Sequence, residues 1–173
     1  MLSAGGILIS PKPSLGAVIH SFMKNNKKQK KIVMVSGGFD PIHPGHTRLF
    51  EEAKKLGDKL VVVINNDNWI RMKKGNGFMS EKDRAEVISS FRHVDEVFIS
   101  EHKKNTKDIS ICKELSKIKP HIFANGGDRF ADNIPEFKLC NELGIKMVFN
   151  VGKGGKIRSS SKLLKDYSKK IKK

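Results

Sequence analysis

Short apolar runs alternate along the chain with segments of helical periodicity. Five of these runs are rich in β-branched or large apolar residues and are predicted to be strands, at residues 32–35, 60–64, 96–99, 121–124 and 146–149. Helical spacing follows them at about 45–56, 81–91, 107–118, 135–143 and from about 160 onward. Because parallel strands need crossover connections, this alternation predicts a Rossmann-like, doubly wound α/β fold with a five-stranded parallel sheet.

The two ends of the chain follow a different pattern. Apolar residues stand at i, i+3, i+4 and i+7 over residues 15–22, which predicts a short docking helix ahead of the main fold. Lysines are frequent in the linker that follows it and again in the last residues. We therefore expect an N-terminal extension over 1–30, a single main domain over 31–168 and a basic tail over 169–173.

The 173 residues carry a formal net charge of +16, from 34 basic and 18 acidic side chains. Residues 24–31 and residues 162–173 each contribute +5, so that +6 remains for the rest of the chain. A moderately basic body suits an anionic small molecule such as a triphosphate, whereas lysine-rich ends are often only solvated. Nucleic acid is therefore the second choice of partner.

Neither the cysteines nor the N-terminal residues indicate another class of protein. Cys112 and Cys140 lie far apart, without the spacing of a disulfide framework or a zinc site. Residues 1–23 lack a basic start, and Pro11 and Pro13 interrupt them before they could span a bilayer. We expect a cytoplasmic protein with no membrane association and no metal site of its own.

The segment after the first predicted strand carries the candidate chemistry, and it reads GGFDPIHPGH over residues 37–46. Glycines at a strand end let a phosphate approach the backbone closely. Pro44 suits the first position of a helix, which puts His43 at the N-cap and His46 in the first turn. Free N–H groups and two imidazoles are then predicted to converge on the oxygens of one phosphate.

Two histidines three residues apart have other interpretations, as polar helix surface or as metal ligands. No third ligand stands at a characteristic spacing, and the order of strand, glycine pair, proline and helix favours phosphate binding. Other phosphate-binding motifs are excluded. Gly155 and Lys156 are followed by Ile157 where a P-loop needs Ser or Thr, and no G-x-G-x-x-G follows the first strand.

The GGFDPIHPGH segment resembles the H-x-G-H signature of the cytidylyltransferase-like nucleotidyltransferase superfamily. The resemblance extends from about residue 31 to residue 167 and includes several motifs in the same order. It is strongest to the glycerol-3-phosphate cytidylyltransferases and to the adenylyltransferases that form ADP-heptose.

This resemblance implies an enzyme that transfers a nucleoside monophosphate from CTP or ATP to a phosphorylated sugar or polyol and releases pyrophosphate. It also implies in-line attack without a covalent intermediate, Mg²⁺ bound with the triphosphate, and a homodimer. Two alternatives stay open. One is a catalytically inactive nucleotide- or RNA-binding protein of the same fold, and the other is an adenylyltransferase for a cofactor precursor such as a pantetheine or flavin phosphate.

The resemblance also assigns roles to residues. The catalytic residues it implies are His43, His46, Lys74 and Arg84. Those implied for nucleotide binding are Gly37, Gly38, Phe39, Asp40, Gly45, Asn125, Gly127, Asp128, Arg158, Ser159, Ser160 and Ser161. Those implied for the acceptor are Asp67, Lys73 and Arg84, the last through a bidentate contact with the acceptor phosphate.

Each of these assignments has a structural alternative. The lysines could belong to a solvated loop, and Arg84 could form a surface ion pair with Glu81 or Asp83. Residues 125–128 could form a plain turn, and Ser159 could be only a helix cap. The R-T-E-G element of the glycerol-3-phosphate enzymes is missing here, which leaves both the nucleotide base and the acceptor open.

Overall fold

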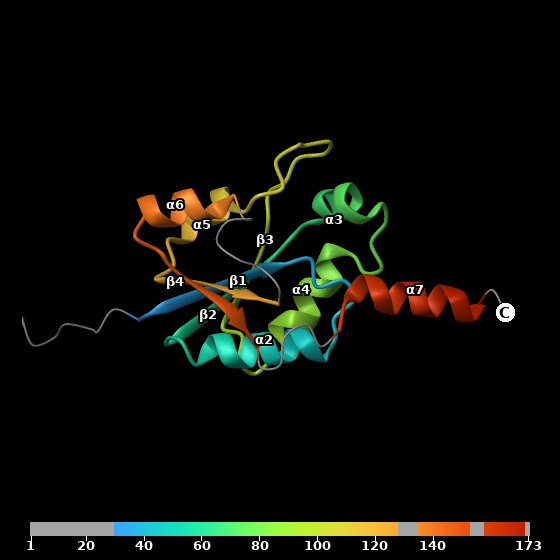
Figure 1. The fold of residues 1–173 in the computed structure, drawn as a ribbon, viewed down its shortest axis with the longest axis horizontal. Helices are drawn as coiled ribbons and strands as arrows, with labels where there is room; N and C mark the ends of the chain where they lie inside the picture. The colour runs from blue at the N-terminus through green and yellow to red at the C-terminus, as the bar shows by residue number, and fades with distance from the viewer. Residues whose placement is uncertain (1–29, 128–134, 153–157, 172–173) are drawn as a thin grey trace, which may run out of the picture.

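The structure is a computed structural model that describes residues 30–127, 135–152 and 158–171. Its centre is a parallel sheet in the order β3-β2-β1-β4-β5 (Figure 1). The strands are β1 (Ile32–Gly37), β2 (Lys59–Ile64), β3 (Glu96–Ile99), β4 (Ile122–Gly126) and β5 (Lys146–Val151). All four neighbouring pairs are parallel, so the predicted fold class and the five predicted strands are confirmed.

Helices cover both faces of the sheet. One face carries α2 (Pro44–Lys54) and α4 (Glu81–Ser89), and the opposite face carries α5 (Cys112–Ile118) and α6 (Glu136–Glu142) (Figure 1). Strand β1 lies in the middle, with β2 on one side and β4 on the other. Along the chain, β2 and β3 are therefore added on one side of β1, and β4 and β5 are then added on the other side. The switch point of this doubly wound sheet lies between β1 and β4.

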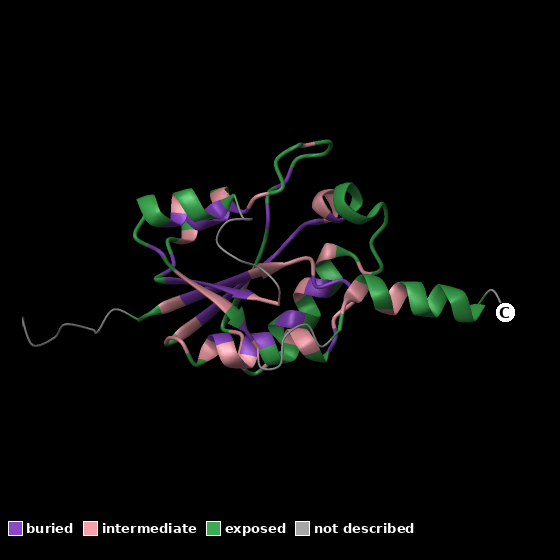
Figure 2. Cartoon of the chain, viewed as in Figure 1, coloured by how far each residue is buried: buried purple, intermediate pink, exposed green. Residues whose placement is uncertain are grey.

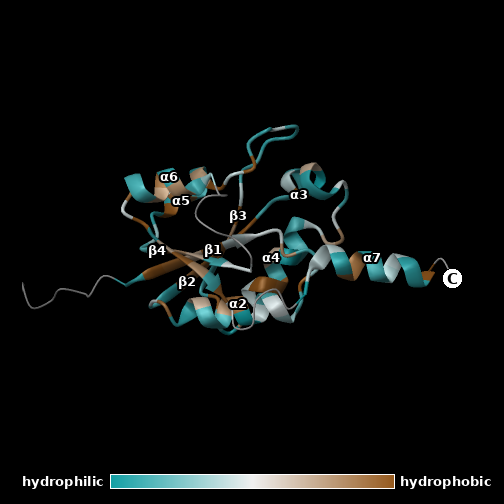
Figure 3. Ribbon diagram, in the orientation of Figure 1, coloured by the Kyte–Doolittle hydropathy of each residue, from teal (hydrophilic) through white to brown (hydrophobic). Residues whose placement is uncertain are grey.

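Alternate residues of the strands build two separate halves of the core. Val33 and Val35 of β1 pack with Phe50 of α2 and Ile88 of α4. Met34, between the two valines, belongs to the other half. The central strands are buried along most of their length (Figure 2) and are the most hydrophobic part of the fold (Figure 3). Burial on both faces explains why these strands read as continuous apolar runs in the sequence.

Two helices differ from the sequence prediction. Helix α3 (Asp67–Lys74) was not predicted, and it begins where the Asn66 side chain accepts a hydrogen bond from the Trp69 amide at 3.0 Å. Helix α5 was predicted from residue 107 but begins at Cys112. Asp108 accepts from the Ser110 amide at 2.9 Å, and such side-chain turns compete with helix formation.

The last helix, α7 (Ser160–Ile171), extends away from the sheet and has no buried residue (Figures 1 and 2). Its first turn lies next to the β1–α2 turn, since the Ser160 hydroxyl donates to the Pro41 carbonyl at 2.9 Å. Within the described ranges, no helix has both the length and the apolarity needed to cross a membrane. The predicted docking helix and most of the basic linker lie outside the described residues, and the domain bounds stay predictions.

We expect the replacement of Phe50 by Ala to lower the free energy of unfolding by about 3–5 kcal/mol. The Phe50 ring is fully buried and meets the edges of the Phe39 and Phe91 rings, at centroid distances of 5.2 and 5.5 Å. Urea denaturation measures the change. Phe137 of α6 is 40% exposed, and Phe137→Ala is the control. Equal losses in the two variants would contradict the packing described above.

Candidate functional site

A cavity of about 290 Å³ opens at the carboxyl ends of the strands, at the switch point between β1 and β4. Its walls come from the β1–α2 turn, from α3, from the ends of β4 and β5, and from the start of α7. The residues that line it include Gly37, Gly38, Phe39, His43, Gly45, His46, Trp69, Lys74, Asn125, Gly126, Gly127, Val151, Gly152, Arg158, Ser159, Ser160 and Ser161. Ligands of doubly wound sheets bind at this position.

The two histidines are held by hydrogen bonds within the first turn of α2. Pro44 is the first residue of the helix and His43 is its N-cap, as the sequence predicts. Nδ1 of His43 accepts from the Gly45 amide at 3.1 Å, and Nδ1 of His46 accepts from the His43 amide at 3.3 Å. Since both Nδ1 atoms accept, each neutral ring carries its hydrogen on Nε2. The two Nε2–H groups are thus left to donate to a ligand.

The two rings stack, with centroids 3.8 Å apart and planes 21° from parallel. Burial is the main reason that the pKa of His46 is lowered to about 3, and the neighbouring His43 and Lys74 lower it further. Burial also lowers the pKa of His43, and Arg158 and Lys74 add to this effect. Both imidazoles are therefore neutral at pH 7, so they could serve a ligand as hydrogen-bond donors but not as cations.

Small residues and one aromatic ring shape the floor of the cavity. A Cβ atom at Gly45 would lie 2.9 Å from Cε1 of His43, so a side chain there would displace the His43 ring. A Cβ atom at Gly37 would lie 3.0 Å from the Phe39 ring. Phe39 has a positive φ of 48° and is buried, and its ring meets the His46 ring edge-on at 5.0 Å. Phe39 thus supports His46 from below.

Most of the residues predicted for nucleotide binding come together in this cavity. Asn125 and Gly127 line it at the end of β4, and residues 158–161 line it at the start of α7. These two segments are 33 positions apart in the sequence, counted from Asn125 to Arg158, and the sheet topology brings them to the same wall. Asp128 lies outside the described residues, so its role stays a prediction.

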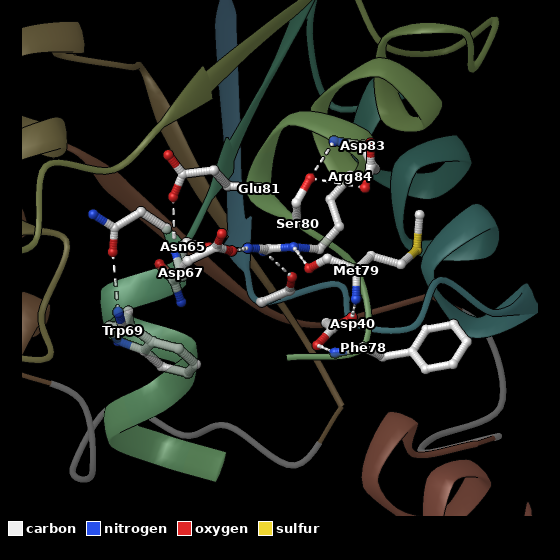
Figure 4. Close-up of polar contacts among 12 residues, drawn as sticks. Asp40, Asn65, Asp67, Trp69, Phe78, Met79, Ser80, Glu81, Asp83 and Arg84 are labelled. Atoms are coloured by element: carbon white, nitrogen blue, oxygen red, sulfur yellow. Dashed lines mark hydrogen bonds and ion pairs between the residues drawn. The ribbon is translucent and has the colours of Figure 1, made fainter. Parts of the chain in front are cut away.

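Asp40 lies beneath the cavity and is not among the residues that line it. Its carboxylate is fully buried and accepts from the amides of Phe78 and Met79, both at 2.8 Å (Figure 4). Its carbonyl accepts from Nζ of Lys74 at 2.9 Å. Lys74 itself lines the cavity, where burial lowers the pKa of its ammonium. Asp40 therefore fixes the loop before α4 and orients Lys74.

Arg84 has a role different from the one predicted. Its side chain is 0% exposed, so it cannot reach an acceptor phosphate in the cavity. The guanidinium donates to the carbonyls of Gly38 and Asn65 at 2.7 Å each, to that of Met79 at 3.3 Å, and to the Asp67 carboxylate at 2.7 Å (Figure 4). The prediction of a direct phosphate contact is corrected, because Arg84 joins the loops around the site. Its ion pair is with Asp67, and not with Glu81 or Asp83.

The other two residues predicted for the acceptor do not line the cavity either. Asp67 is the first residue of α3, where its carboxylate binds Arg84 and its amide donates to Glu81 at 2.8 Å. Lys73 is exposed on α3 and does not line the cavity, although the neighbouring Lys74 does. Lys74, which was predicted as a catalytic residue, is the α3 lysine that the structure brings to the cavity.

Several residues that line the cavity were not predicted from the sequence. Trp69 enters from α3, a helix that was not predicted, and the N-cap residue Asn66 is the sequence signal that could have identified this helix. Arg48 and Leu49 follow Gly45 by three and four residues, so they share its face of α2. Val151 and Gly152 come from the end of β5, and only the sheet topology identifies them.

The described part of the cavity wall is basic. Arg48, Lys74 and Arg158 line it, and no described lining residue is a carboxylate. Among the described residues, no group of three His, Cys, Asp or Glu side chains is placed to hold a metal ion. Neutral imidazole donors, a glycine-rich floor and three cations suit a ligand that carries several negative charges.

Comparison with known protein families agrees with this chemistry. The model of the family described as "Cytidylyltransferase-like" matches residues 34–161. The "Bifunctional protein HldE" of Desulfatibacillum aliphaticivorans is 35% identical over 133 residues, which cover 75% of this chain and 26% of that protein. The "FAD synthase" of Thermococcus kodakarensis is 41% identical over 106 residues, which cover 60% of this chain and 68% of that protein. The chain thus spans about a quarter of the first relative.

Two solved structures share the fold. The lipopolysaccharide core biosynthesis protein from Thermoplasma volcanium has a TM-score of 0.59 and 29% sequence identity, over 72% of this chain and 99% of that one. The pantoate-beta-alanine ligase from Francisella tularensis has a TM-score of 0.50 and 20% identity, over 75% of this chain and 62% of that one. The second similarity concerns the fold alone.

Replacing Arg84 by Met should lower the free energy of unfolding by about 3–5 kcal/mol, because it leaves the buried carbonyls and Asp67 without their partner. Arg84→Lys should restore only part of this loss, since one ammonium cannot reach acceptors on four sides. Urea denaturation measures both variants. If Arg84→Met kept its stability and lost only its affinity for an acceptor, Arg84 would be a binding residue after all.

The low pKa values of the two histidines predict how stability changes with pH. The unfolded chain protonates them near their ordinary pKa of 6.5, whereas folded His46 resists protonation down to about 3. The stability present above pH 6.5 is therefore lost as the pH falls, by about 1 kcal/mol per pH unit for His46.

The window from about pH 6.5 to 5 isolates this effect, because carboxylates in the unfolded chain titrate near 4. Urea denaturation at several pH values should give a shallower slope for His46→Asn than for the wild type. An unchanged slope would show that His46 is not held in its neutral form by the fold.

Proposed function

Because the chain belongs to the cytidylyltransferase-like family of nucleotidyltransferases, we propose that it transfers a nucleoside monophosphate from CTP or ATP to a sugar or polyol phosphate and releases pyrophosphate. The observation that carries the proposal is the pair of stacked, neutral imidazoles above a glycine floor. Their Nε2–H groups can donate to the triphosphate without adding positive charge. The resemblance of the motifs to the adenylyltransferases that form ADP-heptose supports a sugar phosphate as acceptor.

In the proposed reaction, an oxygen of the acceptor phosphate attacks the α-phosphorus of the triphosphate. The bond from this phosphorus to the oxygen that bridges to the β-phosphate breaks, and that oxygen leaves with the electron pair as part of pyrophosphate. The acceptor oxygen already carries negative charge, so the reaction needs no general base. The protein's task is to position the two phosphates and to stabilise the charge that moves onto the leaving group.

The basic and hydroxyl-bearing residues divide this task between them. Lys74, at the end of α3, would neutralise the approaching acceptor phosphate. Arg158 and the serines at 159–161 would bind the β- and γ-phosphates at the start of α7, where helix amides are free to donate. Mg²⁺ would arrive as part of the triphosphate substrate, bound to its phosphate oxygens. The predicted homodimer stays a prediction.

A second candidate is adenylyl transfer from ATP to a cofactor precursor that carries a phosphate, such as FMN. The observation in its favour is the similarity to FAD synthases, which reaches 41% identity over 106 residues and covers 68% of the relative's length. The phosphate chemistry of the two candidates is the same, and they differ only in the body of the acceptor. Pyrophosphate release measured with ATP and CTP against sugar phosphates, polyol phosphates and FMN decides between them.

Replacing His46 by Asn should lower kcat for pyrophosphate release by about 10² to 10³-fold, because a preorganised donor to the triphosphate is lost. The Asn oxygen can still accept from the His43 amide, but Asn has no donor at the position of Nε2. His46→Gln should lose less, since its longer side chain carries an amide donor close to the Nε2 position.

His93 lies outside the cavity, between α4 and β3, and His93→Gln is the matched control, with kcat expected to be unchanged. The assay uses the acceptor that the panel selects. If His46→Asn turned over like the wild type, His46 would have no part in the chemistry and the proposal would fail.

A further inference from the structure

Trp69 lines the cavity, and the proposed reaction gives this residue no role. It is the only tryptophan of the chain, and its side chain is half-buried. Its indole N–H donates to the Ile109 carbonyl at 3.0 Å, and its amide donates to the Asn66 side chain at 3.0 Å. The ring is therefore anchored at its N–H, and the backbone that carries it is held at the start of α3. A Cβ atom at Gly38 would lie 3.6 Å from Cζ3 of this ring, so the benzene edge reaches the phosphate-binding turn.

The place of α3 beside the sheet puts Trp69 on the acceptor side of the cavity. Helix α3 follows β2, so Trp69 and Lys74 enter the cavity from the β2 side of β1. Asn125 and Gly127 enter from the β4 side. The nucleotide is proposed to bind between the β4 end and α7, and the acceptor phosphate beside Lys74. Because Lys74 and Trp69 line the same cavity, the body of an acceptor bound to Lys74 would then meet the indole of Trp69.

The chemistry of this wall selects the shape of the acceptor. The indole N–H is already used, so Trp69 offers an apolar aromatic surface and no hydrogen-bond donor. An open chain of hydroxyl groups would lose water against this surface and find no partner in return. A ring can lay a flat face against the indole and gain stacking or CH contacts.

We propose that Trp69 is a specificity-determining residue whose indole face packs against a ring of the acceptor, so that the enzyme uses ring-bearing phosphate monoesters in preference to open-chain polyol phosphates. This inference rests on the proposed function. The ring can be that of a sugar or the planar system of a flavin, and the experiment separates these two sources.

The first test measures pyrophosphate release and compares the KM values of three acceptors. These are FMN, mannose 1-phosphate and glycerol 3-phosphate. Trp69→Leu removes the aromatic face, and Trp69→Phe keeps an aromatic face but also loses the indole N–H. We expect Trp69→Leu to raise KM for the ring-bearing acceptor by roughly tenfold or more, and Trp69→Phe to raise it by much less. The KM for the triphosphate should stay the same in both variants. Phe137→Leu removes an exposed aromatic ring from α6 and is the control.

The second test measures the binding of the acceptor in the absence of turnover. Since Trp69 is the only tryptophan, the protein's tryptophan emission comes from this one ring. A ring-bearing acceptor should change that emission in a saturable way, and glycerol 3-phosphate should not. FMN absorbs light itself and can therefore change the measured emission without touching the indole. A change of emission with mannose 1-phosphate has to come from contact with the ring. The acceptor that gives both the emission change and the lower KM identifies the source of the ring.

The possible outcomes keep the two proposals apart. If none of the acceptors gave pyrophosphate with either triphosphate, the proposed function would fail. If pyrophosphate were released but glycerol 3-phosphate were the best acceptor, the function would stand and the inference on Trp69 would fail. The same holds if Trp69→Leu changed KM for the triphosphate and for no acceptor, since Trp69 would then belong to the nucleotide side.

Discussion

The geometry of the site depends on the buried guanidinium of Arg84. It binds carbonyls or a carboxylate from four segments, which are the β1–α2 turn at Gly38, the end of β2 at Asn65, the start of α3 at Asp67 and the loop before α4 at Met79. A buried charge is stable only when its donors are satisfied, so these segments have to meet at one point. Arg84 therefore fixes the distance between the phosphate-binding turn and α3, although it does not line the cavity itself.

Within that frame, the two histidines are neutral donors in a basic cavity. Burial is the first cause of their low pKa values, and the neighbouring cations add to it. A second positive charge on stacked rings 3.8 Å apart would repel the first. Arg48, Lys74 and Arg158 line this cavity and would balance the negative charge of the proposed substrates, while the imidazoles would act as directed donors. Directed donors stabilise a charge that moves during a reaction, because they do not have to reorient.

The two walls of the cavity differ in chemistry. The β4 and α7 wall offers an amide, three hydroxyls and helix amides, which suit a polar nucleotide and its phosphates. The α3 wall offers one lysine and the face of one tryptophan. Two substrates that share a phosphate but differ in their bodies can be distinguished by such an arrangement. Relatives with different acceptors are compatible with this, since the phosphate-binding turn can stay the same while the α3 wall changes.

The sequence determined those features that rest on local interactions. The alternation of apolar runs and helical spacing gave the five strands, and the order of glycines, proline and histidines gave the N-cap at His43, because these contacts join residues at most three positions apart. Only the tertiary structure decided the rest. It buried Arg84, took Asp40 away from the cavity, and brought Trp69 into it, through contacts between residues that lie from 17 to 46 positions apart in the chain. Such contacts depend on how strands are ordered in the sheet, and the local pattern of a sequence does not contain that order.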